Sequence, residues 1–233
     1  VHVEPHQLVG RFALTAMGCR SRLRALPSPA CPRCGAPALR TGRVAEPTCG
    51  ECRNWPAALR AARSACLLHP PGDRIVHQLK YRGWSALAEP MAERMAALSF
   101  PADVEEEAAI VVPVPTTKSR IRERGYNQAE LLARAYARRT GRRIELVLER
   151  VSASQTQTVL QPAARGANVA GAFRVTGAGK RLIQGEHLLL VDDVLTTGAT
   201  ATECTRTLVA AGARGVSLLT FARALDARRL TTF

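Results

Sequence analysis

The stretch from His187 to Glu203 reads HLLLVDDVLTTGATATE, and its pattern decides the fold class. Its first part, His187–Val191, is a short and largely apolar run, which is typical of a strand covered on both faces of a parallel sheet. Two adjacent carboxylates, Asp192 and Asp193, follow this run, and a helical pattern over Thr200–Ala211 comes next. A buried strand that leads through a short loop into a helix predicts one unit of an α/β protein.

Strand and helix patterns alternate over the rest of the chain from about Trp55, which predicts right-handed crossovers and a doubly wound, mostly parallel sheet. The further elements that we predict are helices over 73–83, over 87–98 with a bend at Pro90, and from Asn127, strands at 109–112, 144–151 and 216–221, an acidic surface turn at 103–107, and a long loop at 152–170.

The composition suits one α/β domain with a small appendage. The chain has 233 residues, 46% of them hydrophobic, and no apolar run approaches the ~20 residues that span a bilayer. Its net charge of +14 indicates acidic partners such as phosphates, nucleic acid or an anionic surface, without choosing among them. The apolar patch Leu8–Cys19 is interrupted by Arg11 and has no basic residues before it, so we expect a lead-in helix rather than a signal peptide.

Four of the seven cysteines form two pairs, Cys31-x-x-Cys34 and Cys49-x-x-Cys52, with fourteen residues between them. Two such knuckles can place four thiolates around one tetrahedral ion, so we predict a structural zinc site in a module over residues 1–54, followed by a second domain over 55–233. A thioredoxin-type redox motif is the weaker alternative, because turn-forming residues surround both pairs. The remaining cysteines we expect to be small buried hydrophobes, namely Cys19, Cys66 and Cys204. Many cysteines without a secretory signal also indicate a reducing compartment, so we expect a cytoplasmic protein.

The loop Thr196–Thr200 has the features of a phosphate site. It opens a helix whose first N–H groups carry the positive end of the helix dipole, its threonines add hydroxyl donors, and Gly198 allows a close backbone approach. Carboxylates beside a phosphate need other partners, which ribose hydroxyls or Mg²⁺ would supply. The sequence therefore favours a ribose 5-phosphate ligand. A P-loop at Gly177–Lys180 is excluded, because arginines occupy two of its required positions.

The segment Leu188–Thr200 resembles the 5-phosphoribosyl-1-pyrophosphate (PRPP) signature of type I phosphoribosyltransferases. KYRG at 80–83, VPVP at 112–115 and RERGYNQAELLAR at 122–134 are similar to the ComF competence-protein family, which also places a four-cysteine module before a phosphoribosyltransferase-like domain. The resemblance covers most of the chain from Cys31 onward. It implies a type I phosphoribosyltransferase-like fold behind a zinc-binding module, with Mg²⁺ bound alongside PRPP.

The resemblance also assigns residues to roles. Asp192 and Asp193 would hold the ribose hydroxyls as the catalytic pair. The PRPP loop would comprise Val194, Leu195, Thr196, Thr197, Gly198, Ala199 and Thr200. The pyrophosphate side would comprise Pro115, Thr116, Thr117 and Lys118, with Arg120, Arg122 and Arg124 as further candidates whose alternative role is a solvated basic loop. A lid over 152–170 would contribute Gln157, Arg165 and Asn168.

Three functions remain open. The first is an enzyme that transfers a phosphoribosyl group, in which charge stabilisation and positioning do most of the work. The second, implied by the family's association with DNA uptake, is a protein that binds single-stranded DNA, with a regulatory or non-catalytic PRPP site. Its support is the segment 118–143, which holds nine basic and two acidic residues, although the chain is only 4% aromatic. The third is a structural adaptor built around the metal module.

Overall fold

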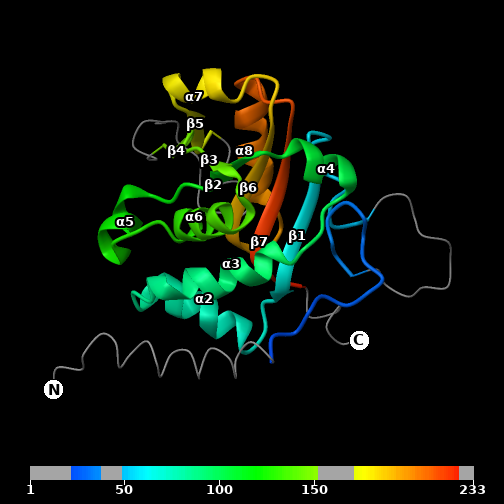
Figure 1. Cartoon of the computed structure of the whole chain (residues 1–233), viewed down its shortest axis with the longest axis vertical. Coiled ribbons are helices and arrows are strands. Elements are labelled where there is room, and N and C mark those ends of the chain that lie inside the picture. Colours follow the sequence, from blue (N-terminus) through cyan, green and yellow to red (C-terminus); the bar gives the residue numbers. More distant parts are fainter. Residues whose placement is uncertain (1–21, 38–48, 152–170, 226–233) are drawn as a thin grey trace, which may run out of the picture.

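The computed structural model describes residues 22–37, 49–151 and 171–225. Its centre is a five-stranded sheet in the order β1-β7-β6-β2-β3, and all of its neighbouring strands pair in parallel (Figure 1). The strands of this sheet are β1 (Leu59–Leu67), β2 (Ile110–Pro113), β3 (Arg143–Ile144), β6 (His187–Leu195) and β7 (Gly215–Arg223). A separate antiparallel pair consists of β4 (Leu148–Arg150) and β5 (Phe173–Val175).

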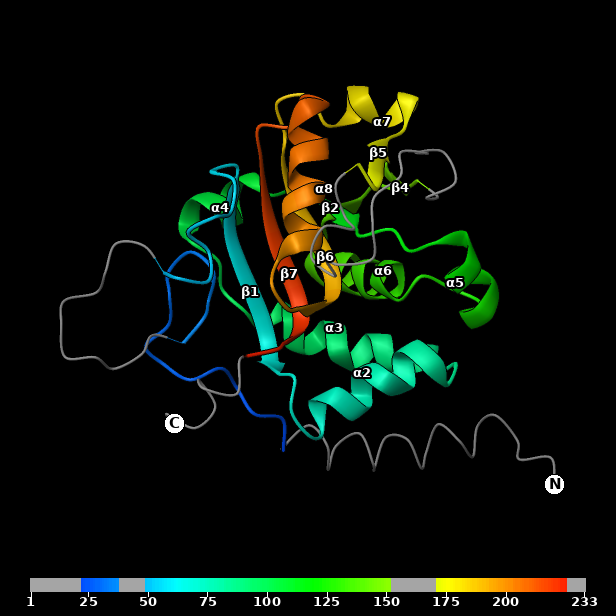
Figure 2. The ribbon, with the colours of Figure 1, turned by 180° about the vertical axis from the view of Figure 1, so that it is seen from behind.

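Helices cover both faces of the central sheet, as Figures 1 and 2 show from opposite sides. On one face, α2 (Gly72–Tyr81), α3 (Ala88–Ala96) and α6 (Gln128–Thr140) share a core with the strands. On the other face, α8 (Ala199–Ala210) packs in a second core. The shorter helices are η1 (Ser85–Leu87), α4 (Ala102–Glu107), α5 (Lys118–Arg124) and α7 (Gly177–Leu182). The predicted doubly wound α/β fold is therefore confirmed.

The four-cysteine module lies against the same face of the sheet as α8. Cys34, Cys52 and Trp55 are buried in the core that also holds Cys204 and Leu208 of α8. Figure 1 shows the described part of the module beside β1, at the edge of the sheet. The module is thus packed into the domain rather than tethered to it.

Several predicted elements are confirmed with small changes in their bounds. The predicted strand at 187–191 continues through both carboxylates to Leu195, because the backbone keeps pairing with β7 as far as Arg223. The helix after Asn127 begins at Gln128, and the side chain of Asn127 caps it by accepting a hydrogen bond from the backbone N–H of Ala129. The helix predicted from Asp73 begins at Gly72, so Asp73 lies in its first turn and is not the cap.

Other predictions are wrong. Residues 144–151 do not form one strand, because β3 ends at Ile144 and β4 belongs to the other sheet. The acidic segment 103–107 is part of α4 rather than a turn, and Glu107 pairs with cations from distant elements. Pro90 lies in the first turn of α3, where its missing N–H costs no helical hydrogen bond, so the helix has no need of the predicted bend.

The connections of the sheet create a crevice at one edge. The chain leaves β2 towards α6 on one face and leaves the neighbouring β6 towards α8 on the other face. Ligands of open α/β sheets bind at such a switch point, beyond the carboxyl ends of the strands. The loops that follow β2 and β6 are the two segments that carry most of the predicted site residues.

Three of our predictions fall on residues outside the described part of the chain. These are the lead-in helix at 8–19, the buried position of Cys19, and the lid at 152–170 with Gln157, Arg165 and Asn168. Within the described ranges, no helix combines the length and the apolar character that crossing a bilayer requires.

Candidate ligand site and metal centre

A cavity of about 440 Å³ lies at the switch point, between the carboxyl ends of β2 and β6. The predicted residues that line it are Pro115, Thr116, Arg120, Asp192, Asp193, Val194, Thr196 and Thr200, and α2 and the β4–β5 sheet contribute Asp73, His77, Lys80, Tyr81 and Arg150. The structure therefore gathers residues from separate stretches of sequence around one space.

The two carboxylates have different environments within this cavity. The side chain of Asp193 is almost fully buried, and its Oδ2 lies 2.7 Å from Nζ of Lys80 on α2. Asp192 is partly exposed, and its Oδ1 accepts a hydrogen bond of 2.8 Å from the backbone N–H of Asp193. Its enclosed position and the neighbouring Asp193 carboxylate together raise the pKa of Asp192 well above its ordinary value. Lys80 thus pairs with Asp193 rather than with Asp192.

The loop after β6 lies at the amino end of α8. Gly198 is the residue before the helix, with φ of +81°, and it provides no side chain to cap the first N–H groups. Thr196 is exposed and Thr200 partly exposed, and both line the cavity. The backbone N–H of Ala199 already donates to the hydroxyl of Thr197, 3.4 Å away. The N–H groups that follow it in the first turn of α8, with the hydroxyls of Thr196 and Thr200 beside them, form a binding place for an anion.

Some predicted residues of this loop lie elsewhere. Leu195 is 2% exposed and belongs to the core, while Thr197 and Ala199 are exposed and do not line the cavity. Gly198 does not line the cavity and contacts the side chain of Trp55, the residue that follows the four-cysteine module.

The loop after β2 forms the opposite wall. Pro115 and Thr116 line the 440 Å³ cavity and also a second cavity of about 530 Å³ between this loop, α5 and the β4–β5 sheet. The hydroxyl of Thr116 is buried and has no hydrogen-bond partner among the described residues. A buried hydroxyl without a partner is costly, so this wall of the cavity carries an unsatisfied polar group.

The other candidates on the pyrophosphate side divide into two groups. Thr117 caps α5 by accepting a hydrogen bond from the backbone N–H of Arg120, and Lys118 lines only the second cavity. Arg122 is exposed and lines neither cavity, and Arg124 packs over the ring of Tyr81, with 4.8 Å between Cζ and the ring centroid.

Lys80 and Arg150 are site residues that were not predicted. Lys80 begins the KYRG motif, so the motif itself was the signal, but nothing in the spacing connects it with Asp193. Arg150 ends a short strand whose sheet was not predicted. Both residues add positive charge to a space that already holds two carboxylates.

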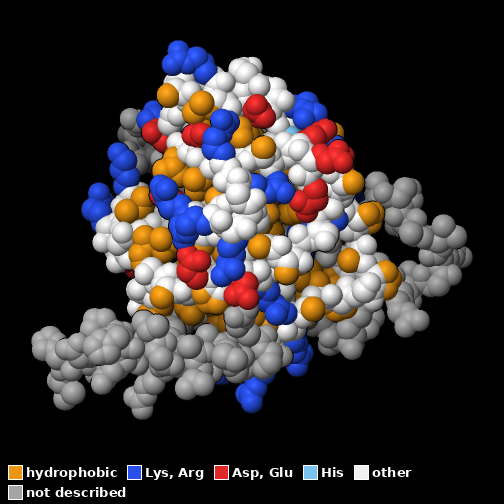
Figure 3. Space-filling model, in the orientation of Figure 1, with side chains coloured by type: hydrophobic (Ala, Val, Ile, Leu, Met, Phe, Trp, Pro, Cys, Tyr) orange, Lys and Arg blue, Asp and Glu red, His pale blue; other side chains and the backbone are white. Residues whose placement is uncertain are grey.

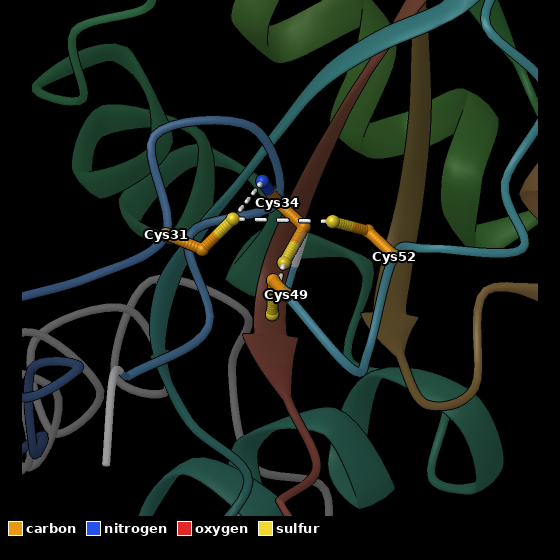
Figure 4. Close-up of side chains that lie close together, drawn as sticks. All are labelled: Cys31, Cys34, Cys49 and Cys52. Atoms are coloured by element: carbon orange, nitrogen blue, oxygen red, sulfur yellow. Dashed lines mark hydrogen bonds between the residues drawn. The ribbon is translucent and has the colours of Figure 1, made fainter. Parts of the chain in front are cut away.

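The four predicted metal ligands converge on one point, as Figure 4 shows. Sγ of Cys31 lies 3.9 Å from Sγ of Cys52, and Sγ of Cys34 lies 3.8 Å from Sγ of Cys49. These distances are far too long for disulfide bonds. They match the spacing of about 3.8 Å that four sulfurs adopt when each lies about 2.3 Å from a tetrahedral ion. The residues therefore fit a metal ion.

Burial and basic side chains shape this centre. Burial raises the pKa of Cys34 and raises that of Cys52 to about 11, which disfavours free thiolates when no cation is bound. Arg223, at the end of β7, is 1% exposed and donates a hydrogen bond of 2.7 Å to the carbonyl of Cys34. Arg33, between the first two cysteines, donates to the carbonyls of Cys52, Trp55, Pro56 and Leu59. The hydrogen bonds of Arg33 and Arg223 thus hold the four-cysteine module against the sheet.

Two further cysteines are packed in the interior. Cys66 and Cys204 are fully buried, and burial raises the pKa of both thiols, that of Cys66 to about 12. They are small core residues, as predicted. Cys19 lies outside the described residues.

A second polar cluster occupies the opposite, amino-terminal end of the sheet. His187 is fully buried, and its Nε2 lies 3.0 Å from Oγ of Ser217 while its Nδ1 lies 3.2 Å from Glu107. Glu107 also pairs with Arg60 and Arg214, and the Arg214 hydrogen bond is the main reason why its pKa is lowered to about 2. Burial lowers the pKa of His187. The histidine is therefore a packed residue and lies far from the cavity along its own strand.

The parallel sheet, the cavity at its switch point and the four converging cysteines together define a doubly wound α/β protein with an N-terminal four-cysteine module that fits a metal ion. No family model matches the chain. Among curated proteins it is 33% identical over 206 residues to the DNA utilization protein YhgH of Salmonella typhi, with 84% of each chain covered. It is 27% identical over 214 residues to the competence protein ComFC of Bacillus subtilis, with 88% of this chain and 82% of that protein covered. The chain belongs to the ComF family of competence and DNA utilization proteins.

Solved structures give more distant similarities. The glutamine PRPP amidotransferase from B. subtilis, complexed with ADP and GMP, is 19% identical with a TM-score of 0.41, and the match covers 61% of this chain and 30% of that chain. The protein TT1426 from Thermus thermophilus is 16% identical with a TM-score of 0.36, over 65% of this chain and 79% of that chain. The match therefore spans about a third of the amidotransferase.

Proposed function

We propose that the cavity binds PRPP or a related phosphoribosyl ligand, and that the protein acts as a phosphoribosyltransferase-like enzyme or as a sensor of that ligand. The observation that carries the proposal is the grouping of Asp192, Asp193, Thr196 and Thr200 around one space at the amino end of α8. The 5-phosphate would bind to the N–H groups of α8 and to the threonine hydroxyls. The carboxylate of Asp192 would accept hydrogen bonds from the ribose hydroxyls.

The remaining walls suit the charged end of such a ligand. Lys80, Arg120 and Arg150 supply cations, and Thr116 supplies a hydroxyl that has no partner within the described ranges. The oxygen donors of the carboxylate pair also fit Mg²⁺, which prefers one or two carboxylates together with ligand phosphates. Bound with PRPP, Mg²⁺ would neutralise the pyrophosphate. The protein's own contribution would be to hold the sugar and stabilise the charge that develops as the pyrophosphate departs.

Calorimetric titration with PRPP and Mg²⁺ tests this proposal. We expect saturable binding by the wild type and at least a hundredfold weaker binding by Asp192→Ala/Asp193→Ala, on the order of the loss when paired polar contacts are removed. Glu106→Ala, which removes an exposed carboxylate of α4 at the other end of the sheet, is the matched control. No binding by the wild type would eliminate the proposal, and unchanged binding by the double variant would eliminate the site.

We also propose that the four cysteines hold zinc in a structural role, because four sulfur ligands leave no open position for a substrate. Metal analysis of protein kept under reducing conditions should find close to one zinc ion per chain. Finding no metal, or finding iron as the main metal, would contradict this assignment.

Binding of single-stranded DNA is the second candidate function, and the surface of α5 favours it. Lys118, Arg120 and Arg122 are exposed and have no ion-pair partner in the described part of the chain. Nearby, Tyr81 and Trp84 are 55% and 42% exposed, which offers rings for stacking bases. Figure 3 shows basic side chains over the region of α5 and α6, but the arginines of α6 are paired with carboxylates, for example Arg134 with Glu130.

A salt series with a labelled oligonucleotide tests this candidate. We expect the logarithm of the binding constant to fall with the logarithm of salt concentration, and Lys118→Ala/Arg120→Ala/Arg122→Ala to make the slope shallower by about 2. A slope that is flat, or that the triple variant leaves unchanged, would rule out α5 as the contact surface.

A further inference from the structure

The phosphate loop contacts Trp55, the first residue after the four-cysteine module. Gly198 has φ of +81°, and a Cβ atom added there would lie only 2.7 Å from Nε1 and 2.8 Å from Cε2 of the Trp55 indole. Real Cβ atoms do not approach other atoms so closely, so the flat ring lies directly against the backbone of the loop. The loop and the ring are 143 positions apart in the sequence, and no pattern in the sequence connects them.

Trp55 is held from the side of the module. It follows Cys52 by three residues, its backbone N–H donates to the carbonyl of Cys52, and its own carbonyl accepts a hydrogen bond from Arg33. Its side chain is buried, with the whole residue 8% exposed. The position of the ring is therefore set by the same short segment that positions two metal ligands.

The indole N–H itself has no hydrogen-bond partner among the described residues. A buried donor without an acceptor costs free energy, so this ring is not kept in place by a bond of its own. It is kept there by packing between the module and the loop. Its N–H also lies against the backbone of the loop that a phosphate ligand would contact, which makes the ring a sensitive reporter of that backbone.

We infer that Trp55 is a positioning residue through which the metal-bound module holds Gly198 and the phosphate loop in the shape that binds a ligand. This inference rests on the proposed PRPP site. It goes beyond that proposal by giving the metal an effect on ligand affinity, although the metal lies outside the cavity. If Trp55 were only a core residue, its removal would change stability and leave the affinity of the folded protein unchanged.

Fluorescence provides a direct test, because the chain has two tryptophans. In Trp84→Phe, Trp55 is the sole indole, and titration with PRPP and Mg²⁺ should shift its emission with the same midpoint that calorimetry gives. Calorimetric binding without any change in Trp55 emission would overturn the inference. Absence of calorimetric binding would instead eliminate the proposed function, so the two failures are distinguishable.

Substitutions separate positioning from stability. Trp55→Ala should weaken PRPP binding about tenfold or more, and Trp55→Phe, which keeps a flat ring, should restore most of it. Val216→Ala is the matched control, because Val216 is a fully buried residue of the same core but lies at the amino end of β7. Equal losses of affinity in Trp55→Ala and Val216→Ala would overturn the inference.

Metal removal and a second substitution complete the test. Treatment with a zinc-selective chelator, followed by restoring Mg²⁺, should weaken PRPP binding strongly in the wild type. The loss should be much smaller in Trp55→Ala, because that variant already lacks the contact between the Trp55 ring and Gly198. If the metal-free protein loses its circular-dichroism spectrum, Gly198→Ala provides the readout. It should weaken binding in the wild type and cause a clearly smaller further loss in Trp55→Ala, where the ring no longer overlaps the new methyl group. Equal losses in both backgrounds, for either the chelator or the alanine, would overturn the inference.

Discussion

The two ends of the central sheet both hold carboxylates, but in opposite electrostatic settings. At the amino end, Glu107 contacts two arginines and a histidine, and its pKa is lowered to about 2. At the carboxyl end, Asp193 pairs with Lys80, Asp192 has no ion-pair partner among the described residues, and the pKa of Asp192 is raised. The same strand, β6, runs from one end to the other.

This difference indicates that the amino end stabilises the fold, and it supports the proposed ligand site at the carboxyl end. A carboxylate whose partners are all supplied by the protein stabilises the folded state and has little need of a ligand. An enclosed acid kept beside another acid costs stability, and such a cost is typical of a functional site.

The largest effect should follow from removing the buried histidine at the amino end. His187→Ala leaves a cavity and unpairs Ser217, so we expect a loss of about 3 kcal/mol in the free energy of unfolding. Urea denaturation measures it, with His69→Ala as the control on a partly exposed histidine. The affinity for PRPP should not change in this variant. A loss of affinity comparable to that of Asp192→Ala/Asp193→Ala would show that the two ends of the sheet do not act separately.

At the carboxyl end, Lys80→Met should cost about 2 kcal/mol, because it leaves the buried Asp193 carboxylate without its cation. Adding Asp193→Asn to this variant should restore most of the loss, since the uncompensated charge is then gone. Urea denaturation of both variants checks this expectation. A double variant no more stable than Lys80→Met would show that the lysine acts by packing alone.

A smaller effect of opposite sign is expected at Asp192. A folded-state pKa above the unfolded value means that the ionised group opposes folding at neutral pH, and this penalty is absent below the unfolded pKa. Asp192→Asn should therefore stabilise the protein by about 1 kcal/mol while weakening PRPP binding. Thermal unfolding and calorimetry measure the two changes. A destabilised Asn variant would contradict the picture of a strained acid pair.

The smallest effect is a pH dependence at the amino end. The pKa of Glu107 is lowered from 4.5 to about 2, so its stabilising contribution is full above about pH 4.5 and is lost as the pH falls toward 2. The lowered pKa of His187 acts in the same direction below about pH 6.5. The difference in the free energy of unfolding between wild type and Glu107→Gln should shrink as the pH falls from about 4.5 toward 2. A difference that grows in acid would contradict the assignment.

Much of the fold could be predicted because its central strands are buried on both faces. All nine residues of β7 are buried, and such strands occur in the sequence as apolar runs. The edge strand β1 was missed because Arg60 and Arg63 interrupt it, and their partners lie far away on α4 and in the four-cysteine module. The strand predicted at 144–151 was wrong because the chain changes sheets between Ile144 and Leu148, where no glycine or proline marks the change.

The candidate site was predictable only where it is continuous in the sequence. Asp192, Asp193, Thr196 and Thr200 follow one strand pattern, so strand geometry alone places them at one edge. Lys80 and Trp55 reach the same region from other elements, and only the folded chain shows the contacts that they make. The candidate residues that follow β6 were thus predictable, and Lys80, Arg150 and Trp55 were not.

Arg223 has a consequence for how the protein is made. It is the last residue of the last strand in the described part of the chain, and its guanidinium satisfies the carbonyl of Cys34, 189 positions earlier. On the ribosome, the cysteine knuckle therefore emerges long before the side chain that completes its surroundings. Stable metal capture in the native arrangement should wait until this strand has been made, so truncated translation products would hold the ion weakly.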